Sequence, residues 1–207
     1  MPRHYALFGG TFDPFHAGHL AVARAARAEA DEVIVIPGGT PPHRAGTGAT
    51  SEERWLMAVL ATLAEPGMRV ARWETDRAGA GRTYAIDTLA AARAALGPDA
   101  RLSWVIGADA MALIPTWKDV GALFAGMGFL VVPRDGHGEA WVRAELAASG
   151  LPLERVGFVP MPEVDVSATE VRAMLASGGD VGPMLAPEVV AFARKYRPYR
   201  SAAETTT

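Results

Sequence analysis

Two histidines near the amino terminus, His16 and His19, are spaced so that they could bind one anion together. Side chains three residues apart share one face of a helix. We expect a helix here because residues 20–30 are rich in Ala and contain no Gly or Pro. The amino end of a helix presents backbone N–H groups and favours negative charge. Two imidazoles at such a helix entrance indicate a phosphate-binding site.

The residues just before the histidines would position this site. Residues 5–8 form a short apolar run typical of a buried strand, and Gly9 and Gly10 follow it. Small residues at that place let backbone N–H groups approach an anion closely. Taken singly, a Gly pair is often only a turn and a histidine at a helix start is often only a cap. The combination favours a loop that binds phosphate.

Arg172 is a cationic residue that has an unusual position in the sequence. Ser167 and Glu170 have the spacing of a capping box, which predicts that a helix begins at Ser167. Arg172 would then lie in the first turn, where the helix dipole disfavours a cation. An anion bound at this helix end would remove the conflict.

Gly107, Asp109 and Trp117 are further candidates for ligand contact. Gly107 ends an apolar run and would let a ligand ring approach the backbone, while Asp109 could accept hydrogen bonds from a ribose or cap the following helix. Trp117 follows a proline break and precedes Lys118. An indole in this setting is either a stacking platform or a buried core residue, and the residues alone favour neither.

Two arginines remain open on the residues alone. Arg44 lies in the loop 38–49, which holds Gly, Pro and Thr, and a solvated loop charge is favoured there over a phosphate contact. Arg134 follows the apolar run 129–132 and could reach a phosphate from a strand end. The basic run 194–200 is interpreted as a helix end with a favourable dipole rather than as a nucleic-acid contact.

Apolar runs alternate with helical stretches along the chain, which predicts an α/β fold with a doubly wound, mostly parallel sheet and a small C-terminal helical segment. The expected strands are 5–8, 32–36, 68–73, 102–106, 129–132 and 156–159, and the expected helices are 20–30, 52–64, 84–96, 141–149, 169–176 and 188–196. In the helix 52–64, the apolar stripe predicted to face the core is Trp55, Leu56, Val59, Leu60 and Leu63. We expect one domain over 1–200 and a frayed tail at 201–207. Ligands bind such sheets at the carboxyl ends of the strands.

The bulk composition narrows the class of protein. The 207 residues are 50% hydrophobic and 21% charged, with a formal net charge of −3 and no cysteine. The absence of cysteine excludes a disulfide framework and thiolate metal sites. The net negative charge does not indicate binding to nucleic acid or to an anionic membrane. Without an apolar segment of secretory or membrane-spanning length, we expect a cytoplasmic protein without nucleic-acid or membrane partners.

The stretch from Gly9 to Leu20, G-G-T-F-D-P-x-H-x-G-H-L, resembles the signature of the nucleotidylyltransferase superfamily. Further motifs follow in the order found in nicotinate-nucleotide adenylyltransferases: P-P-H-R, a Tyr-containing segment at 83–88, I-G-x-D, T-W and S-A-T-x-x-R. The resemblance extends from Leu7 to about Tyr199. One departure is Ala85, which stands where the family usually has Thr.

This resemblance implies a Rossmann-like nucleotidyltransferase fold and the transfer of AMP from ATP to nicotinate mononucleotide. It assigns catalysis to His16, His19 and Arg172. It assigns ATP binding to Gly9, Gly10, Thr11, Phe12, Gly18, Gly107, Asp109, Ser167 and Thr169, and mononucleotide binding to Arg44, Tyr84, Ala85, Trp117, Lys118 and Arg134. Mg²⁺ is expected on the substrate phosphates, which hold it together with water. Adjacent phosphates are expected to favour cationic imidazoles, whose ordinary pKa is near 6.5.

Other functions stay open at this stage. The acceptor could be nicotinamide mononucleotide or another phosphorylated compound, as in pantetheine-phosphate adenylyltransferases and cytidylyltransferases. A non-catalytic nucleotide sensor of the same fold is a second possibility, although the presence of both histidines and Arg172 argues against it. The oligomeric state does not follow from the sequence.

Overall fold

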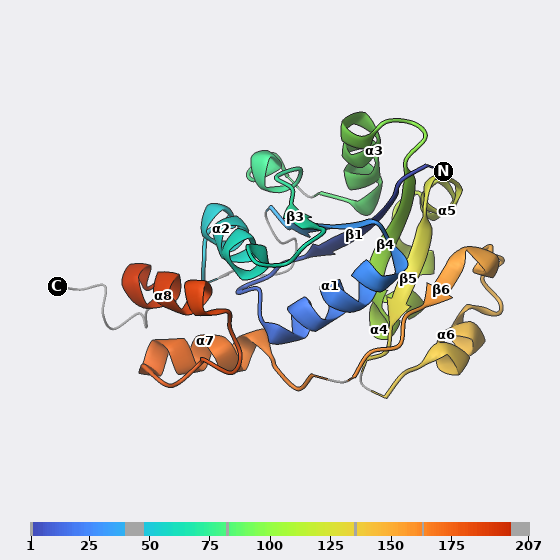
Figure 1. Cartoon of the computed structure of the whole chain (residues 1–207). Helices are drawn as coiled ribbons and strands as arrows, with labels where there is room; N and C mark the ends of the chain where they lie inside the picture. The colour runs from blue at the N-terminus through green and yellow to red at the C-terminus, as the bar shows by residue number, and fades with distance from the viewer. Residues whose placement is uncertain (1, 40–47, 82, 135, 163, 200–207) are drawn as a thin grey trace.

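The computed structural model describes residues 2–39, 48–81, 83–134, 136–162 and 164–199. Their centre is a six-stranded sheet in which every neighbouring pair of strands is parallel, in the order β3-β2-β1-β4-β5-β6 (Figure 1). The strands are β1 (His4–Gly10), β2 (Glu32–Pro37), β3 (Met68–Val70), β4 (Arg101–Gly107), β5 (Gly128–Val132) and β6 (Val156–Phe158). The strand order reverses between β1 and β4. In parallel sheets, this reversal is where ligands bind.

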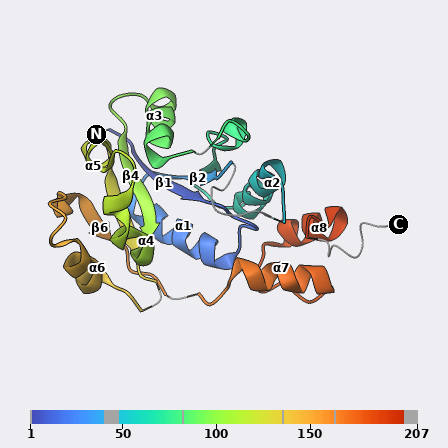
Figure 2. The ribbon, with the colours of Figure 1, turned by 180° about the vertical axis from the view of Figure 1, so that it is seen from behind.

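Helices cover both faces of the sheet, as the two opposite views show (Figures 1 and 2). They are α1 (Ala17–Glu29), α2 (Ser51–Thr62), α3 (Ala85–Leu96), α4 (Ala108–Ala112), α5 (Val120–Gly126), α6 (Glu139–Leu146), α7 (Ala168–Ser177) and α8 (Pro187–Tyr196). Three 3₁₀ turns, Thr75–Arg77, Ile114–Thr116 and Leu153–Arg155, complete the described elements. Residues of α1, α2, α7 and α8 share one apolar core, and residues of α3, α4, α5 and α6 share the other.

Alternate residues of the central strands enter the two cores. In β1, Ala6 belongs to the core under α1 while Leu7 belongs to the core under α3, and both are fully buried. In β2, Val33 and Ile34 divide in the same way. A strand with period two that is covered on both faces needs apolar residues at every position, which explains the unbroken apolar runs of these strands.

The expected fold class is confirmed, with all neighbouring strands parallel rather than most of them. Helix ends shift by up to three residues: α1 begins at Ala17 rather than at 20, and α6 ends at Leu146 rather than at 149. The larger differences lie in short elements. The strand expected at 68–73 ends at Val70, and α4 and α5 were not predicted. Helix α4 is only five residues long, and α5 begins next to Gly121 and ends at Gly126, so neither has a helical pattern long enough to recognise. Among the described residues, no helix has both the length and the apolar character to cross a membrane.

Candidate active site

The two histidines lie at the amino end of α1, just beyond the carboxyl end of β1. His16 is the N-cap of α1 and His19 is in its first turn. Their rings stack with centroids 3.7 Å apart and an angle of 26° between planes. The backbone N–H of His16 donates to Nδ1 of His19 across 3.3 Å. This bond makes Nδ1 an acceptor, so that a neutral His19 carries its proton on Nε2.

Burial holds both imidazoles in their neutral form. His16 is 8% exposed, and burial together with the charge of Arg134 lowers its pKa from 6.5 to about 4. Burial, His16 and Arg134 lower the pKa of His19 well below 6.5. Without bound phosphate, desolvation opposes the charged form of both imidazoles. That adjacent phosphates favour the cationic form stays a prediction for the substrate-bound site. At neutral pH each ring offers one N–H donor.

Glycines make room for this arrangement. A Cβ atom at Gly18 would come within 3.1 Å of Cε1 of His16, and one at Gly10 would come within 2.6 Å of the Phe12 ring. Phe12 has a φ of 50°, a left-handed conformation that turns its ring back over Gly10 and against His19, with ring centroids 4.9 Å apart. The predicted loop glycines thus permit close packing of the rings around His19.

Arg172 reaches the same loop from α7, far along the chain. Its Nη1 donates to the backbone carbonyl of Asp13 across 2.7 Å, and its Nη2 donates to Oγ1 of Thr169 across 3.2 Å. Ser167 is the N-cap of α7, and its Oγ accepts a hydrogen bond from the N–H of Glu170. Arg172 therefore contacts the loop at Asp13, which is three residues before His16. The sequence analysis predicted this convergence.

Gly107 and Asp109 lie at the carboxyl end of β4, across the strand reversal from Gly10. Gly107 is the N-cap of α4 and Asp109 lies in the first turn, so Asp109 is not the cap itself. A Cβ at Gly107 would come within 2.5 Å of Oδ1 of Asp109. Nε of Arg134 is 4.0 Å from Oδ2 of Asp109, and Arg134 also acts on the pKa of both histidines. These neighbours place Arg134 beside the residues expected to bind ATP.

A cavity of about 320 Å³ opens beyond Asp109, at the carboxyl ends of β5 and β6. Its lining includes Ala108, Pro133, His137, Glu139 and Phe158. The ring of His137 packs on Trp141 with centroids 3.9 Å apart. The sequence analysis gave His137 no role. Its position next to Ala108 could be found only from the fold.

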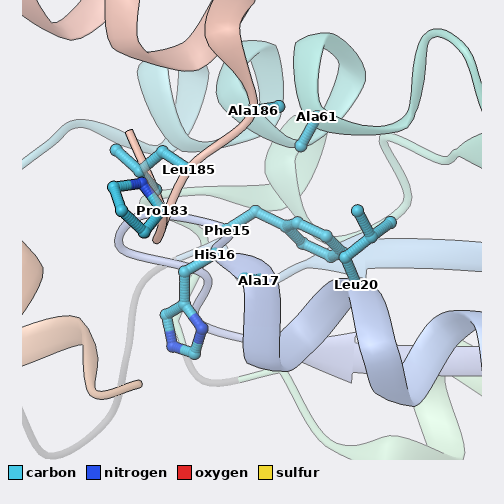
Figure 3. Close-up of a pocket in the computed structure, with 8 residues that line it drawn as sticks. All are labelled: Phe15, His16, Ala17, Leu20, Ala61, Pro183, Leu185 and Ala186. Carbon is cyan, nitrogen blue, oxygen red and sulfur yellow. The ribbon is translucent and has the colours of Figure 1, made fainter. Parts of the chain in front are cut away.

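A smaller cavity of about 150 Å³ lies on the other side of His16, between α1 and the segment that precedes α8 (Figure 3). Its lining is mostly apolar: Phe15, His16, Ala17, Leu20, Ala61, Pro183, Leu185 and Ala186. In Figure 3 the rings of Phe15 and His16 extend in different directions from the turn before α1. Ligand pockets usually measure about 300–1,000 Å³, so this cavity is too small for a nucleotide.

Tyr84, Trp117 and Lys118 form a separate group on the other side of β4. Trp104 of β4 packs edge-on against Trp117, with ring centroids 6.3 Å apart, and also lies against Gly9. Nζ of Lys118 lies 4.8 Å from the centre of the Tyr84 ring. Tyr84 is the N-cap of α3, and Ala85 is the first residue of that helix. Lys118 and Tyr84, both assigned to the mononucleotide by the resemblance, thus lie next to each other, while their contact with a mononucleotide stays a prediction. Arg44 lies outside the described residues.

Three buried polar side chains under the site were not among the predicted site residues. Asp13 is 2% exposed, Arg54 is 1% exposed and Tyr199 is 7% exposed. The hydroxyl of Tyr199 donates to Oδ1 of Asp13 across 2.9 Å. A signal existed for Asp13, which stands within the G-G-T-F-D-P motif. The sequence gave no signal for Arg54, which is not part of the apolar stripe predicted for the helix 52–64.

Comparison with known proteins agrees with this geometry. A family model described as cytidylyltransferase-like matches residues 7–174. The chain is 42% identical over 197 residues to the probable nicotinate-nucleotide adenylyltransferase of Streptomyces coelicolor, covering 93% of this chain and 98% of the relative. It is 39% identical over 212 residues to the protein of the same description from Stenotrophomonas maltophilia, covering 94% and 96%.

Among solved structures, a Plasmodium falciparum nicotinic acid mononucleotide adenylyltransferase complexed with NaAD has a similar fold, with a TM-score of 0.74, 16% sequence identity and coverage of 95% of this chain and 97% of that one. The fold and the site define a nucleotidyltransferase. The chain belongs to the cytidylyltransferase-like family and, within it, to the nicotinate-nucleotide adenylyltransferases.

Proposed function

We propose that this protein transfers AMP from ATP to nicotinate mononucleotide, forming deamido-NAD and pyrophosphate in NAD biosynthesis. The observation that carries the proposal is the meeting of His16, His19 and Arg172 at one loop, in a chain of this family. The 5′-phosphate of the mononucleotide attacks the α-phosphorus of ATP in line. A new P–O bond forms as the bond between the α-phosphorus and the bridging oxygen breaks, and pyrophosphate leaves.

This reaction requires positioning and charge stabilisation more than proton transfer, because the attacking phosphate is already an anion. Nε2–H of His19 supplies a donor whose direction is fixed by the bond between His16 N–H and His19 Nδ1. We assign both histidines to oxygens of the α- and β-phosphates. Preorganised donors of this kind act where charge accumulates in the transition state. A phosphate that binds here would raise both pKa values toward the cationic form.

Arg172, Ser167 and Thr169 are assigned to the leaving pyrophosphate. They sit at the amino end of α7, where the helix dipole favours an anion. Gly107 and Asp109 are assigned to the adenosine, with the cavity at Ala108 and His137 beside them. Arg134, which the resemblance assigned to the mononucleotide, is assigned instead to a phosphate of ATP, because its charge acts on both histidines.

The acceptor ring is assigned to the group of Trp117, Tyr84 and Lys118. An indole face suits stacking on a pyridine ring. The Lys118 ammonium, held over Tyr84, brings a positive charge to this group. A cation here would favour the carboxylate of nicotinate over the uncharged amide of nicotinamide, which the sequence alone left undecided.

Mg²⁺ is proposed to arrive with ATP. Among the described residues no cluster of three His, Cys, Asp or Glu side chains could hold a metal ion, and the residues at this edge are mainly hydrogen-bond donors. That donor set fits an ion held by phosphate oxygens and water rather than by a protein cage. The ion would neutralise part of the phosphate charge when bound.

Pyrophosphate release with purified protein tests the proposal. We expect turnover with ATP and nicotinate mononucleotide, and slower turnover with nicotinamide mononucleotide. Faster adenylylation of the amide would overturn the choice of acceptor. ATP binding without turnover on either mononucleotide would favour the sensor.

A further inference from the structure

Arg54 is a buried guanidinium that, among the described residues, donates hydrogen bonds to two backbone carbonyls near the site. It lies in the first turn of α2 and is 1% exposed. Its Nη1 donates to the carbonyl of Thr11 across 2.6 Å, and its Nη2 donates to the carbonyl of Gly39 across 2.6 Å. A buried charge is expensive unless it is hydrogen-bonded. Here the hydrogen bonds join the segment that follows β1 to the segment that follows β2.

Tyr199, after α8, holds the same loop from another direction. Its hydroxyl donates to Oδ1 of Asp13, and the carboxylate also accepts hydrogen bonds from the N–H groups of Gly48 and Ala49. The carbonyl of Asp13 accepts from Arg172. Residues 11–13, called the 11–13 loop below, are therefore tied to α2, to α7 and to the segment after α8.

The 11–13 loop runs from the Gly pair to the residues just before His16. A displacement of this loop would move the N-cap of α1, and with it the stack of His16 on His19. It would also move the carbonyl that holds the Arg172 head. Since catalysis at this site depends on donor placement, a shift of about 1 Å from a remote change can cost up to about 10²-fold in rate.

We propose that Arg54 and Tyr199 are positioning residues for adenylyl transfer, which fix the 11–13 loop and through it His16 and Arg172. The inference rests on the proposed function for its kinetic part only. Neither residue touches substrate in this assignment. The guanidinium is required because its planar fork serves two carbonyls at once, which a Lys ammonium cannot do in the same geometry.

A purely stabilising role is the competing explanation, and Arg93 provides a matched control. From α3, Arg93 also donates to backbone carbonyls, those of Pro98, Ala100 and Gly126. These carbonyls precede β4 and β5, at the amino ends of the strands and away from the histidines. Arg93→Lys should therefore lose stability of a similar kind without disturbing the site. Tyr196, exposed at the end of α8, gives the control Tyr196→Phe.

The test compares Arg54→Lys and Tyr199→Phe with Arg93→Lys and Tyr196→Phe. Each is measured for kcat and KM below its melting temperature, and for the NMR signals of His16 and His19 in labelled protein. We expect kcat to fall at least ~10-fold in Arg54→Lys and a few-fold in Tyr199→Phe, with KM for ATP changed by less than about threefold. The histidine signals should shift in these two variants and stay in place in both controls.

Wild-type kcat in the folded Arg54→Lys and Tyr199→Phe proteins, or unmoved histidine signals, would overturn the inference. Equal losses of kcat in Arg54→Lys and Arg93→Lys would also overturn it. If Arg54→Lys does not fold, Tyr199→Phe decides by the same criteria. If the wild type has no activity, the proposed function fails, and the histidine signals still decide whether Arg54 and Tyr199 hold the loop.

Discussion

Two groups of side chains, the one proposed to bind the phosphates (the phosphate region: His16, His19 and Arg172) and the one proposed to bind the acceptor (the acceptor region: Tyr84, Trp117 and Lys118), are built in different ways. Rings and backbone carbonyls surround the phosphate side chains, and His16 is nearly buried. The acceptor side chains lie nearer the surface: Tyr84 is 40% exposed, Lys118 is exposed, and Trp117 is half-buried at a right angle to Trp104.

In the proposed function, the phosphate region promotes the reaction and the acceptor region recognises the acceptor. The phosphate donors are fixed before substrate arrives, so their contribution appears mainly in kcat. The acceptor side chains present a ring and a charge at the surface, so their contribution appears mainly in KM and in the choice of acceptor. The following predictions test this division, beginning with the largest effect.

His19→Ala removes one fixed donor from the phosphate region. We expect kcat to fall by roughly 10²–10³, with KM for the mononucleotide little changed. Steady-state kinetics on protein shown to be folded by circular dichroism would measure this. A variant with nearly full turnover would remove His19 from the mechanism.

The buried neutral imidazole of His16 predicts a pH-dependent stability. Its pKa is about 4 in the folded protein against 6.5 as the reference, so on acidification the unfolded chain takes up the proton first. The stability contributed by the neutral ring is complete above pH 6.5 and is lost as the pH falls toward 4. At pH 5 the loss is on the order of 2 kcal/mol.

Urea unfolding of the wild type and of His16→Asn at pH 7 and pH 5 would measure this loss. Between pH 7 and pH 5, the unfolding free energy of the wild type should fall by about 2 kcal/mol more than that of the variant. Equal losses in both proteins would show that the imidazole of His16 is not held neutral by burial.

Trp117→Leu tests stacking in the acceptor region. Loss of the indole should raise KM for nicotinate mononucleotide about tenfold, since one aromatic contact contributes about 0.5–1.5 kcal/mol beyond its area. We expect kcat and the affinity for ATP to stay near wild type. A large fall in kcat instead would mean that the acceptor region takes part in the chemistry.

Lys118→Met is expected to have the smallest effect. Lys118 is exposed, so solvent and salt screen its charge, and the preference for nicotinate over nicotinamide mononucleotide should fall only a few-fold. Competition between the two mononucleotides at low and high salt measures the change. An unchanged preference would assign the choice of acceptor to backbone N–H groups.

The sequence predicted the parts of this structure that depend on local patterns. The six strands follow from apolar runs, and His16, His19 and Arg172 were identified from motifs whose order matches a family. The prediction of which side of α2 faces the core was wrong. Its expected stripe included Leu63, which is 70% exposed, whereas Arg54, Met57, Ala58 and Ala61 are buried. A helical pattern alone predicts that an Arg faces solvent. Arg54 is buried because its guanidinium donates to the carbonyls of Thr11 and Gly39, which come near it only through the fold.

The state of the histidines could not be predicted either. A pKa depends on how many neighbouring atoms exclude water, and the rings of Phe12 and Phe15 around His19 become neighbours through the fold. Likewise, nothing local relates Tyr199 to Asp13, which lie 186 positions apart.

At Gly18, protein stability and enzymatic turnover favour different residues. Gly18 lies in the first turn of α1, and alanine forms helix more readily than glycine, so selection for stability alone would favour alanine at this position. The added methyl group would lie 3.1 Å from Cε1 of His16, so the His16 ring, which stacks on His19, would have to shift by a few tenths of an ångström. A screen for heat resistance and a screen for product formation should therefore choose opposite residues at this one position.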